Sequence, residues 1–133
     1  MADQAKTQTV KKPLILLIED DSLLIKMYKT KFTAEGFEVI VAEEGESGLK
    51  MALENPVNFI ILDVMMPRLS GIEVLESLRQ NPKGKTVPVI VLSNLDREEK
   101  AKKALSLGAK EFLVKANFTP TQIVEKVRKY LGK

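Results

Sequence analysis

Polar side chains stand directly after four short apolar segments of this 133-residue chain, and their types suit metal and phosphoryl chemistry. They are, in chain order, Glu19, Asp20, Asp21, Asp63, Ser93, Asn94 and Lys115. Carboxylates brought together repel one another unless positive charge lies among them. A lysine offsets part of that repulsion, and a hard divalent cation such as Mg²⁺ offsets more, because carboxylate oxygens are its preferred ligands.

Each of these residues also has an ordinary structural explanation when taken alone. Glu19 and Asp20 could form an acidic cluster favoured by the dipole at a helix N-terminus, and Asp21 suits an N-cap. Asp63 and Ser93 could be turn residues at strand ends, and a lysine is usually on the surface. Only the joint arrangement at successive strand ends favours chemistry over these explanations.

Five short apolar segments are candidates for buried strands. They cover residues 14–18, 39–42, 59–62, 89–92 and 112–114. Four of them are continuous apolar runs rather than alternating ones, which is typical of strands covered on both faces in a parallel sheet.

Amphipathic segments lie between these strands and predict five helices. They cover residues 22–35, 46–54, 71–80 and 97–107, and a fifth begins after Thr119. In the first, Leu24, Met27, Tyr28 and Phe32 recur at helical spacing and Gly36 follows as a stop signal. Thr119 to Gln122 has the pattern of a capping box.

Five β-then-α units in succession predict an α/β fold with an open, doubly wound parallel sheet. Ligands of such sheets bind at the carboxyl ends of the strands. The topology therefore predicts that the acids, the hydroxyl and the lysine meet at one edge of the sheet.

The chain resembles the response-regulator receiver domain from Pro13 to Leu131. Four segments carry the resemblance in order: 16–21, 60–67, 88–93 and 108–115. The spacings of 30 residues from Asp63 to Ser93 and 22 from Ser93 to Lys115 fit that family. The resemblance implies a flavodoxin-like (βα)5 fold with strand order 2-1-3-4-5 and a receiver domain over residues 13–133. The polar segment of residues 1–12 predicts a flexible tail.

The resemblance also implies what the site residues do. Asp63 would accept a phosphoryl group, Lys115 would pair with Asp63 and with a phosphoryl oxygen, and Ser93 would donate its hydroxyl. The expected cofactor is Mg²⁺ or Mn²⁺. Its ligands would be Asp20, Asp63 and the backbone carbonyl of Met65, with Glu19 acting through a water; Met65 and Asn94 would also lie beside the phosphate.

A phosphoryl switch of this type needs a donor and an output. The resemblance implies a histidine kinase or phosphotransfer protein as the donor. The chain has no histidine, so it cannot itself be a histidine phosphodonor. Ser93 would move toward the phosphate and Phe112 would fill the space it leaves. The output face would be the fourth helix, the fifth strand and the fifth helix, where a downstream protein or a second copy of the chain would bind.

Two features depart from the family pattern. The residue after Lys115 is Ala116 instead of the usual proline, so we expect a trans peptide bond and a locally different loop, because a cis bond before a non-proline residue is costly. Met65 and Leu95 stand two residues after Asp63 and Ser93. Both are apolar, and we expect that they fail to orient water and make the phosphoryl group long-lived.

Composition excludes several other functions. The net charge of +3 comes from scattered lysines interleaved with acids, so we expect no direct binding to nucleic acid. There is no cysteine and no membrane-length apolar run, and we expect a cytoplasmic protein without substrate turnover of its own. Three alternatives stay open: an interaction module of this fold without phosphoryl transfer, a flavin mononucleotide carrier and an aspartate-dependent phosphohydrolase.

Overall fold

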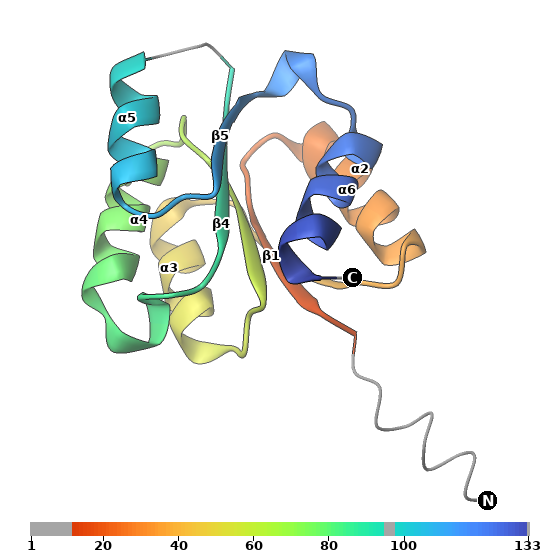
Figure 1. The fold of residues 1–133 in the computed structure, drawn as a ribbon, viewed down its shortest axis with the longest axis horizontal. Helices are drawn as coiled ribbons and strands as arrows, with labels where there is room; N and C mark the ends of the chain where they lie inside the picture. The colour runs from red at the N-terminus through yellow and green to blue at the C-terminus, as the bar shows by residue number, and fades with distance from the viewer. Residues whose placement is uncertain (1–11, 95–97, 133) are drawn as a thin grey trace, which may run out of the picture.

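The computed structural model describes residues 12–94 and 98–132. Its strands and helices alternate along the chain (Figure 1). The strands are β1 (Leu14–Ile18), β2 (Glu38–Ala42), β3 (Phe59–Asp63), β4 (Val89–Ser93) and β5 (Glu111–Val114). The α-helices are α2 (Ser22–Ala34), α3 (Gly45–Glu54), α4 (Gly71–Gln80), α5 (Glu98–Ser106) and α6 (Pro120–Leu131). Two short 3₁₀ helices, η1 (Pro82–Gly84) and η2 (Lys115–Asn117), complete the described elements.

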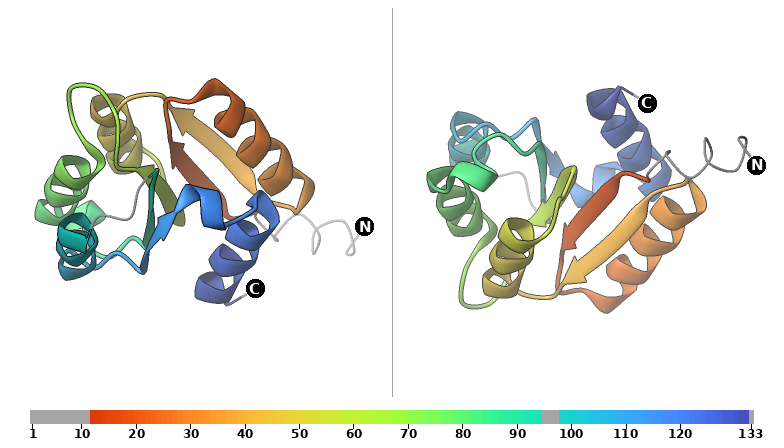
Figure 2. Two further views of the ribbon diagram at one scale, coloured as in Figure 1. Left: turned by 90° about the horizontal axis from the view of Figure 1, so that it is seen from above. Right: turned by 90° about the horizontal axis from the view of Figure 1, so that it is seen from below.

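All five strands pair in parallel, in the order β2-β1-β3-β4-β5. This confirms the flavodoxin-like fold with strand order 2-1-3-4-5. Helices α2 and α6 cover one face of the sheet, and α3, α4 and α5 cover the other (Figures 1 and 2). Parallel strands need such crossover helices, which place one apolar layer on each face.

Burial separates the three central strands from the two edge strands. Every residue of β3 and β4 is buried, as are four of the five residues of β1. In β2, however, only Ala42 is buried, and in β5 only Leu113. Both faces of the segment 39–42 are still covered, as expected, because Val39 and Val41 pack against one apolar layer and Ile40 and Ala42 against the other. Burial is lower than in the central strands because β2 lies at the edge of the sheet.

Local signals explain most helix boundaries. Asp21 is the N-cap of α2, where its side chain accepts from the N–H groups of Leu23 and Leu24. Gly36 follows this helix with a φ of +94°, which suits glycine. The capping box of α6 is present, with Thr119 and Gln122 bonded to each other's backbone. These boundaries follow from hydrogen bonds that the sequence specifies locally.

One residue of the predicted apolar stripe on α2 was misplaced. Tyr28 and Phe32 are buried, but Met27 is 41% exposed. Residues 24, 28 and 32 repeat every four positions and share the face toward the sheet, and Met27 lies outside that row.

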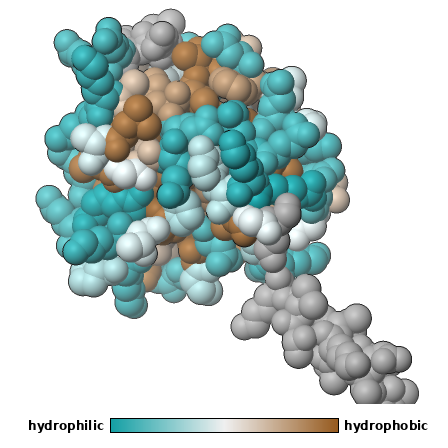
Figure 3. Space-filling model, viewed as in Figure 1, coloured by the Kyte–Doolittle hydropathy of each residue, from teal (hydrophilic) through white to brown (hydrophobic). Residues whose placement is uncertain are grey.

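Some expectations fall outside the described residues. These are the flexible tail, apart from Lys12, the first residue of the predicted helix 97–107, and Leu95. No helix in the described part of the chain is both long and apolar enough to cross a membrane. Hydrophilic atoms cover most of the face in Figure 3, and hydrophobic atoms gather mainly toward its upper part.

Candidate functional site

The predicted site residues meet at the carboxyl edge of the sheet. Asp63 and Ser93 are the last residues of β3 and β4, and Glu19 directly follows β1. Lys115 begins η2 directly after β5. Glu19, Asp63 and Ser93 are 1–2% exposed, so three polar side chains are buried at the end of an apolar sheet.

A lysine lies between two of the acids. The Nζ atom of Lys115 is 2.8 Å from Oε1 of Glu19 and 3.2 Å from Oδ1 of Asp63. The contact with Asp63 agrees with the sequence expectation, whereas the shorter contact with Glu19 was not foreseen. One ammonium group is thus shared by two buried carboxylates, which leaves an excess of negative charge.

Asp20 adds a third carboxylate to this pair. Carboxylate oxygens of Glu19, Asp20 and Asp63 all lie within 4.8 Å of one another, and Asp20 itself is exposed. The exposed position of Asp20 leaves the cluster reachable from solvent. These three residues form the acid cluster.

The acid cluster fits a divalent cation. Oε1 of Glu19 is buried, and its close contact is the ion pair with Lys115 at 2.8 Å. The other oxygen of Glu19 accepts from the N–H of Asp21 at 3.1 Å. An all-oxygen cluster of three carboxylates with a single paired lysine suits Mg²⁺ or Mn²⁺ better than a soft metal.

Burial and repulsion from Glu19 raise the pKa of Asp63 to about 7, against the opposing effects of Lys115 and of the Met65 N–H. Burial alone would lower the pKa of Lys115, but the attraction of Glu19 and Asp63 outweighs it, so this pKa is raised. The lysine therefore stays charged while the charge of Asp63 depends on its surroundings. A bound cation would favour the ionised form of Asp63.

The segment after Asp63 is held close to its carboxylate. The N–H of Met65 donates to Oδ1 of Asp63 at 3.2 Å, and the Met65 side chain is 48% exposed. Gly71 packs so tightly that a Cβ there would lie 2.3 Å from the carbonyl oxygen of Asp63. Arg68 has a φ of +67°, a left-handed conformation that is uncommon for arginine. Close packing and backbone strain thus fix the chain beside Asp63.

The segment after Lys115 forms a 3₁₀ turn in place of the proline-containing loop that is usual in the family. No peptide bond among the described residues is cis, which agrees with the expected trans bond between Lys115 and Ala116. Residues 115–117 form η2, and the N–H of Phe118 donates to the carbonyl oxygen of Lys115 at 3.3 Å. Lys115 still reaches the acid cluster from this 3₁₀ turn.

The two remaining predicted residues, Asn94 and Phe112, are not part of the acid cluster. Asn94 is exposed directly after β4. Phe112 is half-buried in β5, where it packs against the apolar layer under α3, α4 and α5. Its backbone pairs with Val91, two residues before Ser93 on the neighbouring strand.

Sequence reasoning missed a tyrosine beside the site. Tyr28 of α2 is 2% exposed, and burial raises the pKa of its phenol, with Glu19 and Asp63 adding to the effect and Lys115 opposing it. Its place on the apolar stripe of α2 marked it only as a core residue. The signal available in the sequence was a tyrosine on a helix that starts at Ser22, three residues after Glu19.

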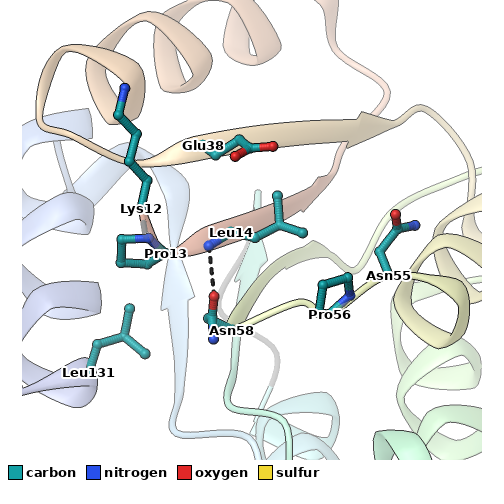
Figure 4. A pocket seen from close by; sticks show the side chains of 8 residues that line it. All are labelled: Lys12, Pro13, Leu14, Glu38, Asn55, Pro56, Asn58 and Leu131. Carbon is teal, nitrogen blue, oxygen red and sulfur yellow. Dashed lines mark hydrogen bonds between the residues drawn. The ribbon is translucent and has the colours of Figure 1, made fainter. Parts of the chain in front are cut away.

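A cavity at the opposite edge of the sheet has different chemistry. It has a volume of about 710 Å³ and lies where β1 and β2 begin, with Lys12, Glu38 and Asn58 among its lining residues (Figure 4). The N–H of Leu14 donates to Oδ1 of Asn58 there. Because one cation and one carboxylate line this cavity, it favours neither anionic nor cationic ligands. The acid cluster lies outside the cavity.

Comparisons with known proteins agree with this geometry. A family model described as the response regulator receiver domain matches residues 15–128. The transcriptional regulatory protein CpxR of Escherichia coli (strain K12) is 38% identical over 117 residues, which is 88% of this chain and 48% of CpxR. The chain thus spans about half the length of this curated relative.

Solved structures show the same fold. The Francisella response regulator 1452 receiver domain is 33% identical, with a TM-score of 0.80 over 89% of this chain and 95% of that one. The receiver domain of the sensor histidine kinase PA1611 from Pseudomonas aeruginosa PAO1, with magnesium coordinated in its active site cleft, has a TM-score of 0.82 at 21% identity, covering 92% and 100% of the two chains. The chain belongs to the response-regulator receiver domain family.

Proposed function

We propose that Asp63 accepts a phosphoryl group from a phosphohistidine of a histidine kinase or phosphotransfer protein. The observation that supports this most directly is the position of Asp63, which is buried and paired with Lys115 at an edge where Asp20 is open to solvent. A carboxylate oxygen of Asp63 forms the new bond to phosphorus while the bond from phosphorus to the imidazole nitrogen breaks. The imidazole retains the electron pair of that bond and takes up a proton.

The residues of the acid cluster prepare this reaction. Asp20, Asp63 and the backbone carbonyl of Met65 would hold Mg²⁺ or Mn²⁺, and Glu19 would act through a water. When bound, the cation supplies charge neutralisation for the transferred phosphoryl oxygens. Lys115 stabilises the same oxygens from the other side, because its ammonium group is already fixed at the carboxylates.

Ser93 and Phe112 carry the switch in this proposal. Ser93 donates its hydroxyl to the phosphoryl group from the end of β4, and Phe112 moves inward on the neighbouring strand. The changed surface is formed by α5, β5 and α6, the fourth and fifth helices with the fifth strand between them. A downstream protein or a second copy of the chain binds there.

The proposal has consequences for the role of the chain in the cell. The domain acts in the cytoplasm, passes its signal by protein contacts, and binds neither nucleic acid nor membrane itself. It promotes its own phosphorylation and dephosphorylation without turning over a separate substrate. Because Met65 is apolar and cannot orient an attacking water, the phosphoryl group persists for minutes or longer at neutral pH; a half-life of seconds would contradict this.

Intact mass spectrometry tests the central proposal. The chain is incubated with phosphoramidate or acetyl phosphate with and without Mg²⁺, beside the variant Asp63→Asn. We expect one added phosphoryl group that requires both the metal and Asp63. Absence of any addition would instead favour an interaction module that keeps the fold without phosphoryl transfer, and an addition to Asp63→Asn would place the acceptor elsewhere.

A further inference from the structure

A second pocket lies at the amino edge of the sheet, between the end of α4, the segment that enters β4 and the turn from α5 to β5. It has a volume of about 520 Å³, within the usual range for sites that hold small molecules. Three cationic side chains line it, namely Arg79, Lys85 and Lys110, and two hydroxyl side chains, Thr86 and Ser106, line it as well. None of its lining residues is a carboxylate.

The charges around this pocket are not balanced by acids. Among residues 12–94 and 98–132, no carboxylate lies within ion-pair distance of Arg79, Lys85 or Lys110. The nearby carboxylate of Glu111 already binds Lys126 and Tyr130. The pocket at the start of β1 differs, because one cation and one carboxylate are among its lining residues. Like charges around one hollow repel each other, and a bound anion would remove that cost.

Arg79 forms the fixed part of the pocket. Its guanidinium donates to the carbonyl oxygens of Gly84, Val87, Leu107 and Gly108, at distances of 2.7–3.3 Å. These four bonds hold the group rigidly and use four of its five N–H hydrogens, which leaves one on Nη2. Burial lowers the pKa of Arg79, with no carboxylate acting against it. The positive charge is thus held in place beside the exposed Lys85 and Lys110.

We propose that this pocket binds a small phosphate-type oxyanion. Ammonium and guanidinium groups form their strongest hydrogen bonds with such oxygens, and the hydroxyl of Thr86 adds a neutral donor. The hydroxyl of Ser106 already donates to the carbonyl oxygen of Lys103 at 2.6 Å. No aromatic side chain lines the pocket to stack on a base, so a compact ligand such as pyrophosphate fits better than a nucleotide. The site is separate from the acid cluster, whose carboxylates repel anions when no metal is bound.

The phosphate group can belong to a free molecule or to a lipid headgroup, and the structure favours the free molecule. The lining residues come from three separate segments around a hollow of about 520 Å³, which suits a compact free molecule better than a headgroup held in a membrane surface. The test therefore has two arms. One uses inorganic pyrophosphate and the other uses vesicles of phosphatidylglycerol and phosphatidylcholine.

In the first arm, the full chain freed of divalent metal is titrated with pyrophosphate while its backbone amide resonances are recorded. We expect saturable shifts centred on Thr86, Gly108 and Lys110. The double variant Lys85→Gln/Lys110→Gln should weaken binding about tenfold or more, equivalent to about 1.4 kcal/mol. The matched control Lys50→Gln, an exposed lysine on α3, should bind like the unchanged chain.

Three outcomes would overturn the proposal. The first is the absence of shifts at millimolar pyrophosphate, and the second is equal weakening in the control and in the double variant. The third is binding to the anionic vesicles, measured by cosedimentation, without binding to pyrophosphate. Because all three lysines are exposed, the variants should keep the fold, which the dispersion of their amide spectra verifies directly.

Discussion

At the carboxyl edge of the sheet, three carboxylates lie close together and a single lysine pairs with two of them. At the amino edge, by contrast, the Arg79 guanidinium donates to four carbonyl oxygens, and Glu111 binds both Lys126 and Tyr130. The first arrangement leaves an excess of negative charge that a bound cation can neutralise. In the second, the partly buried charged groups are satisfied within the protein, and only exposed lysines remain for a ligand.

The difference shows which charges serve stability and which serve chemistry. A buried group with all its partners contributes to the fold, whereas an unsatisfied one costs free energy that only a ligand can return. The pKa values follow the same division. The pKa of Asp63 is raised to about 7, while the pKa of Glu111 is lowered, because its bonds to Tyr130 and Lys126 outweigh the effect of burial.

The largest expected effect is at the amino edge. Arg79→Met leaves four carbonyl groups without a donor and should lower the free energy of unfolding by roughly 3–5 kcal/mol, measured by urea denaturation. The control Arg68→Gln changes an arginine whose side chain is 77% exposed, and should cost less than about 0.5 kcal/mol. Equal losses in the two variants would remove the proposed difference between the edges.

Metal binding should stabilise the protein, and it should do so through the carboxyl edge alone. At a Mg²⁺ concentration 100 times its Kd, the free energy of unfolding should rise by about 2.7 kcal/mol. Asp20→Asn should lose most of this increase at the same concentration. Asp21→Asn is the matched control, because asparagine keeps the N-cap of α2 and should keep the increase. An increase that survives in Asp20→Asn would place the metal elsewhere.

Removing the charge of one carboxylate should change the free energy of unfolding in opposite directions at the two edges. In metal-free protein, Asp63→Asn removes repulsion with Glu19 and leaves Lys115 paired with one acid, so stability should rise by about 1–2 kcal/mol. Glu111→Gln should lower stability, because Lys126 loses its partner. Thermal unfolding of both variants at neutral pH gives the comparison. A loss of stability in Asp63→Asn would mean that repulsion between Asp63 and Glu19 does not destabilise the folded protein.

The smallest effect concerns Tyr130, whose hydroxyl donates to Glu111 at 2.6 Å. This bond and partial burial raise the pKa of Tyr130 to about 12. A raised pKa in the folded state means that the stabilisation is complete below pH 10, the ordinary value for tyrosine, and is lost as the pH rises toward 12. Tyr130→Phe should cost about 0.5–1 kcal/mol at neutral pH.

Ultraviolet absorbance separates the two tyrosines in that experiment. Tyrosinate absorbance of the Tyr28→Phe variant reports Tyr130 alone and should appear only above about pH 11, since the pKa is about 12. Ionisation near pH 10 in this variant would show that the bond to Glu111 is absent in solution.

Much of the fold followed from local sequence patterns. The continuous apolar runs placed the strands within one residue of their ends, because buried strands require them. The caps at Asp21 and Thr119 followed from side chains that bond their own helix. Met27 was misjudged and the lower burial of the edge strand β2 was not foreseen, since burial depends on neighbouring elements that local periodicity does not reveal.

The sequence by itself determined the order of strands and helices and the set of groups at the strand ends, because both depend on residue type and spacing. Only the tertiary structure decided that Lys115 lies closer to Glu19 than to Asp63, that Tyr28 faces the same charges, and that Arg79 gathers four carbonyls from separate turns. Many of these contacts join residues that lie on different elements and far apart in the chain, such as Lys115 with Glu19 and Arg79 with Leu107. Their geometry depends on how the helices pack on the sheet, which no local pattern encodes.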